Sequence, residues 1–266
     1  MVNFEKIPFV ESIAKSCSAL LKNPWMAAFS CVIDAAFLFL YGFVSTFLLQ
    51  IAAEMGSVVI RQLPTIIQQQ RVPKPILALI FDESVRSITF RVIGIGILFA
   101  LITYVLYVLF QGTAWKIAQE LSGKEKKYLD YIKSFAKINI LWFALFAILH
   151  TAYAFLSARN AILSKIAGTT IVSFPHILIL MALVVVSYFA VVSYPLLRVV
   201  KKGFLTIFPG ILFLTVLYLA LSFFLALIAK LSLVAGSIAG IIVMLVFLVY
   251  ARVYITILVQ KAHVGA

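Results

Sequence analysis

The sequence predicts an all-α integral membrane protein, a six-helix transmembrane bundle with amphipathic helices on its cytoplasmic surface. Of its 266 residues, 64% are hydrophobic and 12% are charged, whereas about 25% of the residues of a soluble domain are charged. The apolar residues form runs of about 20 or more, which is the length that crosses a bilayer as a helix. All nine acidic residues lie at or before Asp130, while ten of the 22 Lys and Arg residues follow it, nearly all at the ends of apolar runs. Positive charge confined to segment ends is typical of multi-pass membrane proteins.

We expect a single membrane domain over residues 1–266 that starts with an amphipathic surface helix at 4–22. Asn23, Pro24 and Trp25 then mark the start of a membrane helix, since Asn can cap free amides, Pro suits the first helical position and Trp favours the interface. The predicted spans cover residues 24–50, 84–111, 138–157, 175–197, 204–229 and 233–259.

Two segments between the spans differ from simple turns. Residues 51–87 are polar and are interrupted by Pro64, Pro73 and Pro75, so we expect this stretch to lie on the membrane surface or to dip into it. Residues 113–137 interleave six lysines with apolar side chains, and Gly123 divides them into two short helices. This pattern predicts a basic, amphipathic, interfacial segment.

The positive-inside rule sets the orientation. With the amino terminus inside, the inner segments hold fourteen of the 22 basic residues and the outer segments hold eight. We therefore expect both termini in the cytoplasm, in the plasma membrane of a prokaryotic cell. The first, third and fifth spans are each preceded by a basic, partly apolar segment, which suggests three helical hairpins.

Asp34 is the only acidic residue inside a predicted span, about 15 Å beyond Pro24. Intramembrane acids are costly and often mark function. Arg252 and His150 are predicted to reach a similar depth from the inner side, so Asp34, His150 and Arg252 form a candidate intramembrane polar cluster. Two interpretations stay open: a ligand or proton site, or a structural ion pair between the first and sixth spans.

The basic inner face is the other candidate site. The net charge of +13 comes without a polar domain that could read nucleic acid, so anionic lipid headgroups are the expected partner. A second membrane protein is the other partner considered, and the oligomeric state is open. The predicted headgroup face consists of Lys116, Lys124, Lys126, Lys127, Lys133, Lys137, Lys201 and Lys202.

The sixth span contains a Gly-x-x-x-Gly pattern at Gly236 and Gly240. Small residues at this spacing let a neighbouring helix backbone approach closely, either within the chain or in a homodimer. Pro195 and Pro209 are expected to bend the fourth and fifth spans near the inner surface.

Two stretches resemble a loose group of six-helix prokaryotic membrane families that includes the membrane domain attached to some glycerophosphodiester phosphodiesterases. Leu21 to Trp25 is similar to the start of the first span in that group. The stretch from Gln111 through Gly123 to Asn139 looks like its inner loop. The resemblance implies an accessory role at the membrane and carries over no enzymatic residue, because the catalytic domain has no counterpart here.

The sequence favours a non-enzymatic protein with an accessory or scaffold role in lipid organisation or membrane-complex assembly. A small-solute transporter or channel with Asp34 and Arg252 in its pathway is the alternative. An enzyme acting on lipid is less favoured, because the chain shows no catalytic motif and no carboxylate after Asp130. The histidines and cysteines have no ligand spacing, so we expect neither a metal nor a cofactor.

Overall fold

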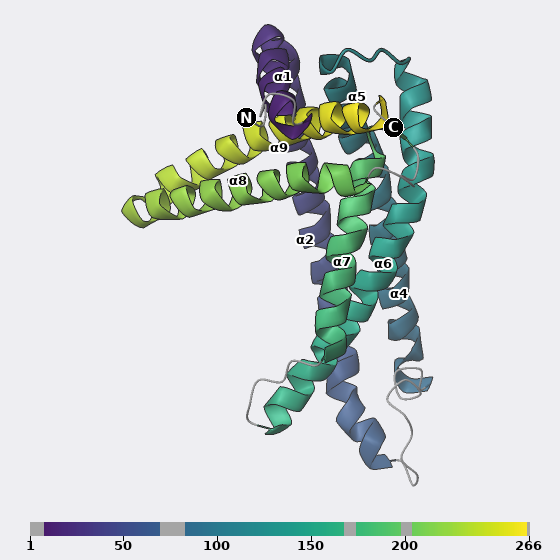
Figure 1. The fold of residues 1–266 in the computed structure, drawn as a ribbon. Helices are drawn as coiled ribbons and strands as arrows, with labels where there is room; N and C mark the ends of the chain where they lie inside the picture. The colour runs from purple at the N-terminus through teal and green to yellow at the C-terminus, as the bar shows by residue number, and fades with distance from the viewer. Residues whose placement is uncertain (1–7, 70–82, 168–173, 198–203, 265–266) are drawn as a thin grey trace. The chain divides into compact units, whose positions relative to one another are not determined.

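The computed structural model describes residues 8–69, 83–167, 174–197 and 204–264, and within these ranges every regular element is a helix. Figure 1 shows the helices in chain order. Six helical segments are long and apolar enough to cross a membrane: Pro24–Val58, Arg86–Leu121, Tyr128–Ala154, Phe174–Ser193, Ile207–Lys230 and Leu233–Ala262. The predicted fold class is confirmed, and the chain is a multi-pass all-α membrane protein.

The first two helices, α1 (Pro8–Lys22) and α2 (Pro24–Gln69), are separated only by Asn23. Asn23 serves α1 as well as α2. Its side-chain nitrogen donates to the Ala19 carbonyl oxygen at 3.3 Å, while its own carbonyl accepts from the amide of Ala27 at 3.2 Å. The side chain therefore satisfies a carbonyl of the last turn of α1, where the sequence predicted a cap for the free amides of α2.

The α2 helix is longer than predicted. It continues through Pro64 to Gln69, so the predicted break at Pro64 is wrong. Proline removes one backbone donor, and the helix continues where its other hydrogen bonds hold. Pro73, Pro75 and the rest of the predicted surface stretch up to residue 82 lie outside the described residues.

Three helical segments follow one another without a break: α4 (Glu83–Leu106), the π-helical turn Tyr107–Gln111, and α5 (Gly112–Leu121). The sequence predicted that an interfacial segment begins at residue 113. Instead, α5 is buried on most of its surface, with Ala114 0% and Ala118 2% exposed, and packs against α6 (Tyr128–Ala167) and α9 (Leu233–Val264). Its apolar residues pack against other helices. The lysines that alternate with them in the sequence led to the prediction of an interfacial segment instead.

The break predicted at Gly123 is confirmed, but only the helix before it is short, because residues 128–137 form the start of the 40-residue helix α6. Gly123 has φ +83°, a left-handed conformation that glycine adopts without steric cost. The backbone nitrogens of Gly123 and Lys124 donate to the carbonyls of Glu120 and Gln119, both at 2.9 Å, as expected for a helix that ends at a left-handed glycine. The chain then enters α6.

The last four helices form two hairpins. The α6 helix packs against α7 (Phe174–Ser193), and α8 (Phe204–Leu231) packs along α9 (Figure 1). Pro195 lies in the turn after α7 and so does not bend that helix, whereas Pro209 lies inside α8.

The chain forms two compact units, residues 36–107 and the remainder, residues 1–35 with 108–266. In the smaller unit, aromatic pairs join α2 to α4 and to the first residue of the π-helical turn. Tyr41 and Phe99 have ring centroids 6.2 Å apart, and Phe37 meets Tyr107 edge-on at 6.1 Å.

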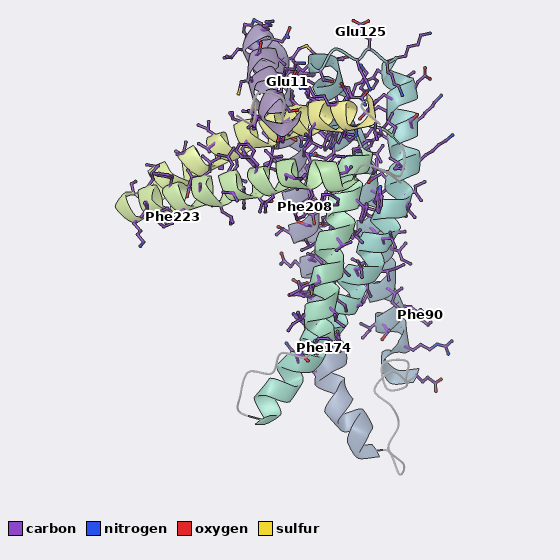
Figure 2. The ribbon with its side chains drawn as sticks, in the orientation of Figure 1. Glu11, Phe90, Glu125, Phe174, Phe208 and Phe223 are labelled. Atoms are coloured by element: carbon purple, nitrogen blue, oxygen red, sulfur yellow. The ribbon has the colours of Figure 1, made fainter. Side chains whose placement is uncertain are left out.

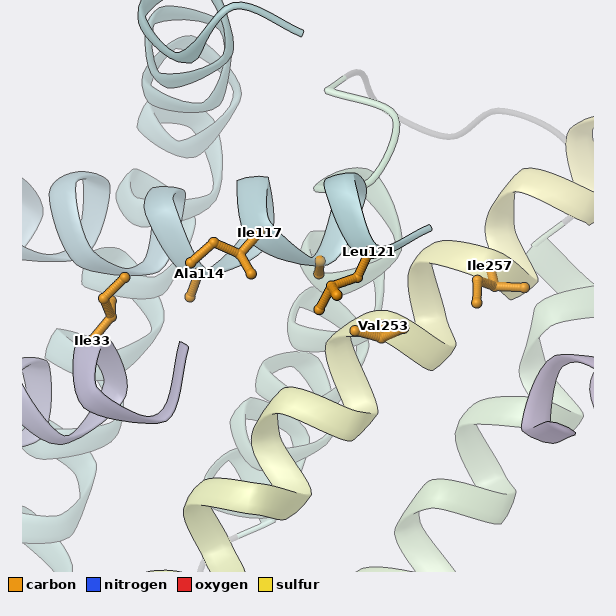
Figure 3. Close-up of a cluster of buried hydrophobic side chains, with 7 residues drawn as sticks. Ile33, Ala114, Ile117, Leu121, Val253 and Ile257 are labelled. Carbon is orange, nitrogen blue, oxygen red and sulfur yellow. The ribbon is translucent and has the colours of Figure 1, made fainter. Parts of the chain in front are cut away.

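The larger unit has a buried hydrophobic cluster at the meeting of three elements (Figure 3). Ile33 comes from the start of α2, while Val253 and Ile257 come from α9. Between them, α5 contributes Ala114, Ile117, Ala118 and Leu121. The cluster therefore holds together helices that are far apart in the sequence.

Many large apolar side chains lie on the outside of the helices (Figure 2), among them Phe208 and Phe223 on α8, which are 53% and 64% exposed. A soluble protein rarely presents so much contiguous apolar surface. A bilayer covers such a surface without cost.

Candidate functional site

A buried polar cluster lies beside the hydrophobic cluster in the larger unit. Asp34 on α2 is 1% exposed, Arg252 on α9 is 6% exposed, and Gln111 is 8% exposed. The guanidinium binds the carboxylate through two parallel hydrogen bonds, with Nη1 to Oδ2 at 2.5 Å and Nη2 to Oδ1 at 2.7 Å. This fork-to-fork geometry is the strongest form of a protein ion pair.

Gln111 completes the cluster by contacting both charged groups. Its Nε2 donates to Asp34 Oδ1 at 3.2 Å, and its Oε1 accepts from Arg252 Nη2 at 2.7 Å. The side-chain amide of Gln111 thus donates one hydrogen bond to the Asp34 carboxylate and accepts one from the Arg252 guanidinium. Asp34 and Arg252 are 218 positions apart in the chain, so the cluster joins the first and last membrane spans.

The π-helical turn Tyr107–Gln111 is the local feature that precedes this contact. Gln111 is its last residue, and α5 starts directly after it. One extra residue in a turn rotates the following helix by about 100° relative to a continuous α-helix. The turn therefore sets which face of α5 meets α9 while Gln111 points at the ion pair.

His150 does not belong to this cluster. Its side chain is exposed on α6, and its Nδ1 lies 3.0 Å from the carbonyl oxygen of Phe146 in the same helix. The sequence placed His150 at a suitable depth, but depth alone does not say which way a helical side chain points.

The cluster is balanced in charge and in hydrogen bonding. One carboxylate faces one guanidinium, and the neutral amide of Gln111 bridges them. In a low-dielectric interior the removal of one partner leaves an uncompensated charge, which costs about 3–5 kcal/mol. This arrangement favours a structural pair that fixes α2, α5 and α9 relative to one another.

Further buried polar contacts surround α5. Gln119, 2% exposed, donates through Nε2 to the Pro195 carbonyl at 2.6 Å, and Trp115 meets Tyr194 edge-on at 5.6 Å between ring centroids. The Tyr194 hydroxyl donates to Asn139 Oδ1 at 3.0 Å. These contacts tie α5 and α6 to the turn that follows α7.

Sequence reasoning missed Gln111 and Gln119 as buried polar residues. A signal was present, since Gln111 directly precedes Gly112 and Gln119 lies one helical turn after Trp115, and amides are out of place on a lipid-facing helix. Gly112 lies against α6, where an added Cβ would stand 3.0 Å from Ile132 Cδ1 and 3.1 Å from Phe135 Cδ1. Part of the stretch that resembles other membrane families is thus the buried junction of this fold.

The two glycines of the Gly-x-x-x-Gly pattern have different surroundings. A Cβ at Gly236 would stand 2.5 Å from Ala229 Cα on α8, whereas one at Gly240 would meet nothing within 4 Å. Gly236 therefore serves packing within the chain. Gly210 on α8 also lies at a close approach, to Tyr254 and Leu258 of α9, and sequence reasoning missed it.

The exposed part of the predicted headgroup face lies in the link between α5 and α6 and in the first turns of α6. Tyr128 and Leu129 of the same segment are 48% and 68% exposed. Exposed lysines beside exposed aromatic and aliphatic side chains are typical of a membrane interface. The lysines that the structure exposes here are Lys124, Lys126, Lys127, Lys133 and Lys137.

Lys116 differs from the other lysines of this group. It is 3% exposed and pairs with Glu120 one turn later on α5, so it does not reach a headgroup in this structure. The i, i+4 spacing of the two residues is the signal that the sequence offered. Lys201 and Lys202 lie outside the described residues.

A third charged group, the Glu11 clamp, joins α1 to α9. Glu11 Oε1 lies 2.7 Å from Lys15 Nζ and its Oε2 lies 2.8 Å from Lys261 Nζ. The close contacts with Lys15 and then with Lys261 lower the pKa of Glu11 from 4.5 to about 2, and the contact with Glu11 raises the pKa of Lys15. The clamp therefore stays charged at neutral pH.

The clamp predicts a pH dependence of stability. Because the pKa of Glu11 is lower in the folded protein, its contribution is full above pH 4.5 and is lost as the pH falls through about 2. We expect the thermal midpoint of the Glu11→Gln variant to lie below that of the wild type at about pH 5, and the two to converge near pH 2. A difference between the two midpoints that does not change over this range would contradict the clamp.

Within the residues that the structure describes, no three His, Cys, Asp or Glu side chains come together as a metal site would require. The chain matches no protein-family model, no curated protein and no solved structure. The resemblance to the six-helix membrane families thus remains a prediction from two short stretches. The fold and the polar clusters define an all-α, multi-pass membrane protein.

Proposed function

We propose that this is a non-enzymatic membrane protein whose basic cytoplasmic face holds anionic lipid headgroups, in support of lipid organisation or of the assembly of another membrane component. The observation that carries the proposal is the row of exposed lysines in the link between α5 and α6 and at the start of α6. The proposal places both termini in the cytoplasm and the chain in the plasma membrane of a prokaryotic cell.

The charges of this segment suit an anionic surface. Residues 124–137 hold five exposed lysines against two exposed acids, Glu125 and Asp130. Each basic residue near an anionic surface adds about 1 kcal/mol of attraction. Tyr128 and Leu129 in the same segment are exposed, and aromatic side chains of this kind favour the headgroup region of a bilayer, which supports the proposal.

The alternative, transport of a small solute past Asp34 and Arg252, is less well supported. Both groups are nearly fully buried, and each satisfies the other through two hydrogen bonds. A pathway residue needs free donors or acceptors for its solute, and here they are shared among Asp34, Gln111 and Arg252.

The proposal predicts a loss of lipid preference in the Lys124→Gln, Lys126→Gln, Lys127→Gln triple variant. In bilayers of phosphatidylglycerol and phosphatidylcholine, we expect the association of spin-labelled phosphatidylglycerol with the protein boundary to fall severalfold at low salt, since each lysine contributes up to about fivefold. The readout is the immobilised fraction of each labelled lipid in electron paramagnetic resonance spectra of the full-length protein.

A matched control removes the same charge from the other predicted side of the membrane. Arg61, Arg86 and Arg91 are exposed on α2 and α4, and all three are changed to glutamine in the control variant. The proposal requires the lysine variant to lose more preference than the arginine variant. Equal losses would mean that net charge, and not this face, attracts the lipid.

A further inference from the structure

A cavity of about 450 Å³ lies between α1, the end of α5 and the end of α9. It contains none of the exposed lysines of residues 124–137. Its polar wall consists of the side chains of Lys15, Ser122, Gln260 and Lys261. Its apolar wall consists of Ala19, Leu121 and Ile257, two of which belong to the buried hydrophobic cluster.

The cavity lies at the same end of three membrane spans. Leu121 ends the second candidate span, and Lys261 is next to the end of the sixth at Ala262. Lys15 and Ala19 precede the first span, which starts at Pro24. All of these span ends are on the predicted cytoplasmic side, where the ends of membrane helices meet phospholipid headgroups.

The charged groups at the cavity carry a net positive charge that one bound anion would balance. Lys15 and Lys261 each bind one oxygen of Glu11, so two ammonium groups face one carboxylate. An ammonium group has three donors. The buried Nζ of Lys261 lies 2.8 Å from Glu11 Oε2 as an ion pair and makes no hydrogen bond to any described residue. The local charge of +1 and the remaining donors suit the single negative charge of a phosphodiester.

Gln260 and Ser122 are already oriented toward each other. Gln260 Nε2 donates to Ser122 Oγ at 2.9 Å, and Ser122 Oγ donates to the Gln119 carbonyl at 2.8 Å. The second amide proton and the carbonyl oxygen of Gln260 are additional groups that could reach a hydroxylated headgroup. The polar wall thus offers both charged and neutral hydrogen-bonding groups beside an apolar one.

We propose that this cavity binds one anionic phospholipid, with its phosphodiester between Lys15 and Lys261 and its glycerol and upper acyl carbons against Leu121, Ile257 and Ala19. From the predicted cytoplasmic end of the spans, the acyl chains of a bound phospholipid can extend into the bilayer. A free phosphate would make no favourable contact with the apolar wall. The inference rests on the proposed function in that both need an anionic lipid, but it assigns a single site with its own residues.

Lys15 and Lys22 provide a matched pair of variants to test the site. Both are exposed lysines on α1, and only Lys15 lines the cavity. Lys15→Gln keeps the Glu11–Lys261 contact between α1 and α9, so the fold is expected to persist. Lys261→Gln tests the other ammonium, and thermal midpoints recorded alongside report on the fold.

The experiment is native mass spectrometry of the full-length protein, delipidated in detergent and titrated with phosphatidylglycerol, phosphatidylcholine or inorganic phosphate. We expect one phosphatidylglycerol to be retained in preference to phosphatidylcholine. Its affinity should fall about fivefold in Lys15→Gln and in Lys261→Gln, and should not change in Lys22→Gln. Equal affinities in Lys15→Gln and Lys22→Gln would overturn the site.

One further outcome distinguishes a lipid from a free phosphate as the bound anion. Another distinguishes the cavity from the exposed lysines of residues 124–137 as the site that holds the lipid. Inorganic phosphate that binds as well as the lipid, and competes with it, would overturn the assignment to a lipid. The Lys124→Gln, Lys126→Gln, Lys127→Gln variant should keep the one retained lipid while it loses boundary preference. Loss of the retained lipid in this variant would show that the exposed lysines, and not the cavity, hold it.

Discussion

The Asp34→Asn variant is expected to lose about 3–5 kcal/mol of unfolding free energy, because it leaves the Arg252 guanidinium buried without a counter-ion. Arg252→Gln should cost a similar amount by leaving the carboxylate uncompensated. In the double variant both introduced side chains are neutral amides that can bond to each other and to Gln111, so much of the loss should be recovered. The measurement is the unfolding free energy of all four proteins in the same detergent.

The same variants separate the structural pair from a transport site. A structural pair predicts that the single variants lose stability and folded yield together. A transport site predicts that Asp34→Asn folds as well as the wild type while solute flux into proteoliposomes stops. Full stability in both single variants would contradict the structural role.

Gly236→Val is expected to destabilise the α8–α9 hairpin, because its Cβ would stand 2.5 Å from Ala229 Cα and 2.8 Å from Ala229 N. Backbone atoms cannot turn aside as a flexible side chain can, so the two helices must separate. Overpacking of this kind costs about 1–3 kcal/mol. The thermal midpoint in detergent measures the loss.

Gly240→Val is the matched control in the same pattern, one helical turn further along α9. An added Cβ at Gly240 meets nothing within 4 Å, so its stability should stay near that of the wild type. If Gly240→Val were the more harmful change, or if it converted a dimer into monomers, the pattern would serve a homodimer.

Hydropathy predicted the six spans well, since a bilayer demands long apolar helices whatever their packing. The start at Pro24 and the break at Gly123 were also predicted, because proline and glycine act locally. The end of α2 was predicted wrongly, because a proline such as Pro64 usually marks a helix boundary, whereas this helix continues to Gln69.

The candidate site was predicted in part. Asp34 and Arg252 could be matched by depth, since each is the unusual charged residue of its span. His150 could not be excluded, because sequence depth does not give the direction of a side chain. Gln111 was missed because a polar residue at a span end usually marks the interface, and because a π-helical turn has no sequence signature that could be used.

The burial of α5 is the main difference between the fold predicted from the sequence and the structure. Lys116 suggested an interfacial helix, but its charge is neutralised by Glu120 and its neighbours Trp115 and Ile117 pack inward. Which face of an amphipathic helix meets protein and which meets lipid depends on the neighbouring helices. That information comes from tertiary contacts such as those of α5 with α6 and α9.

The most direct test of the central claim is the boundary-lipid preference of the wild-type protein as salt is raised. The account predicts that labelled phosphatidylglycerol associates more strongly than labelled phosphatidylcholine at low salt. The difference should shrink toward about 1 M salt, where the screening length is about 3 Å. Equal association of the two lipids at every salt concentration would contradict the claim that the basic face holds anionic headgroups.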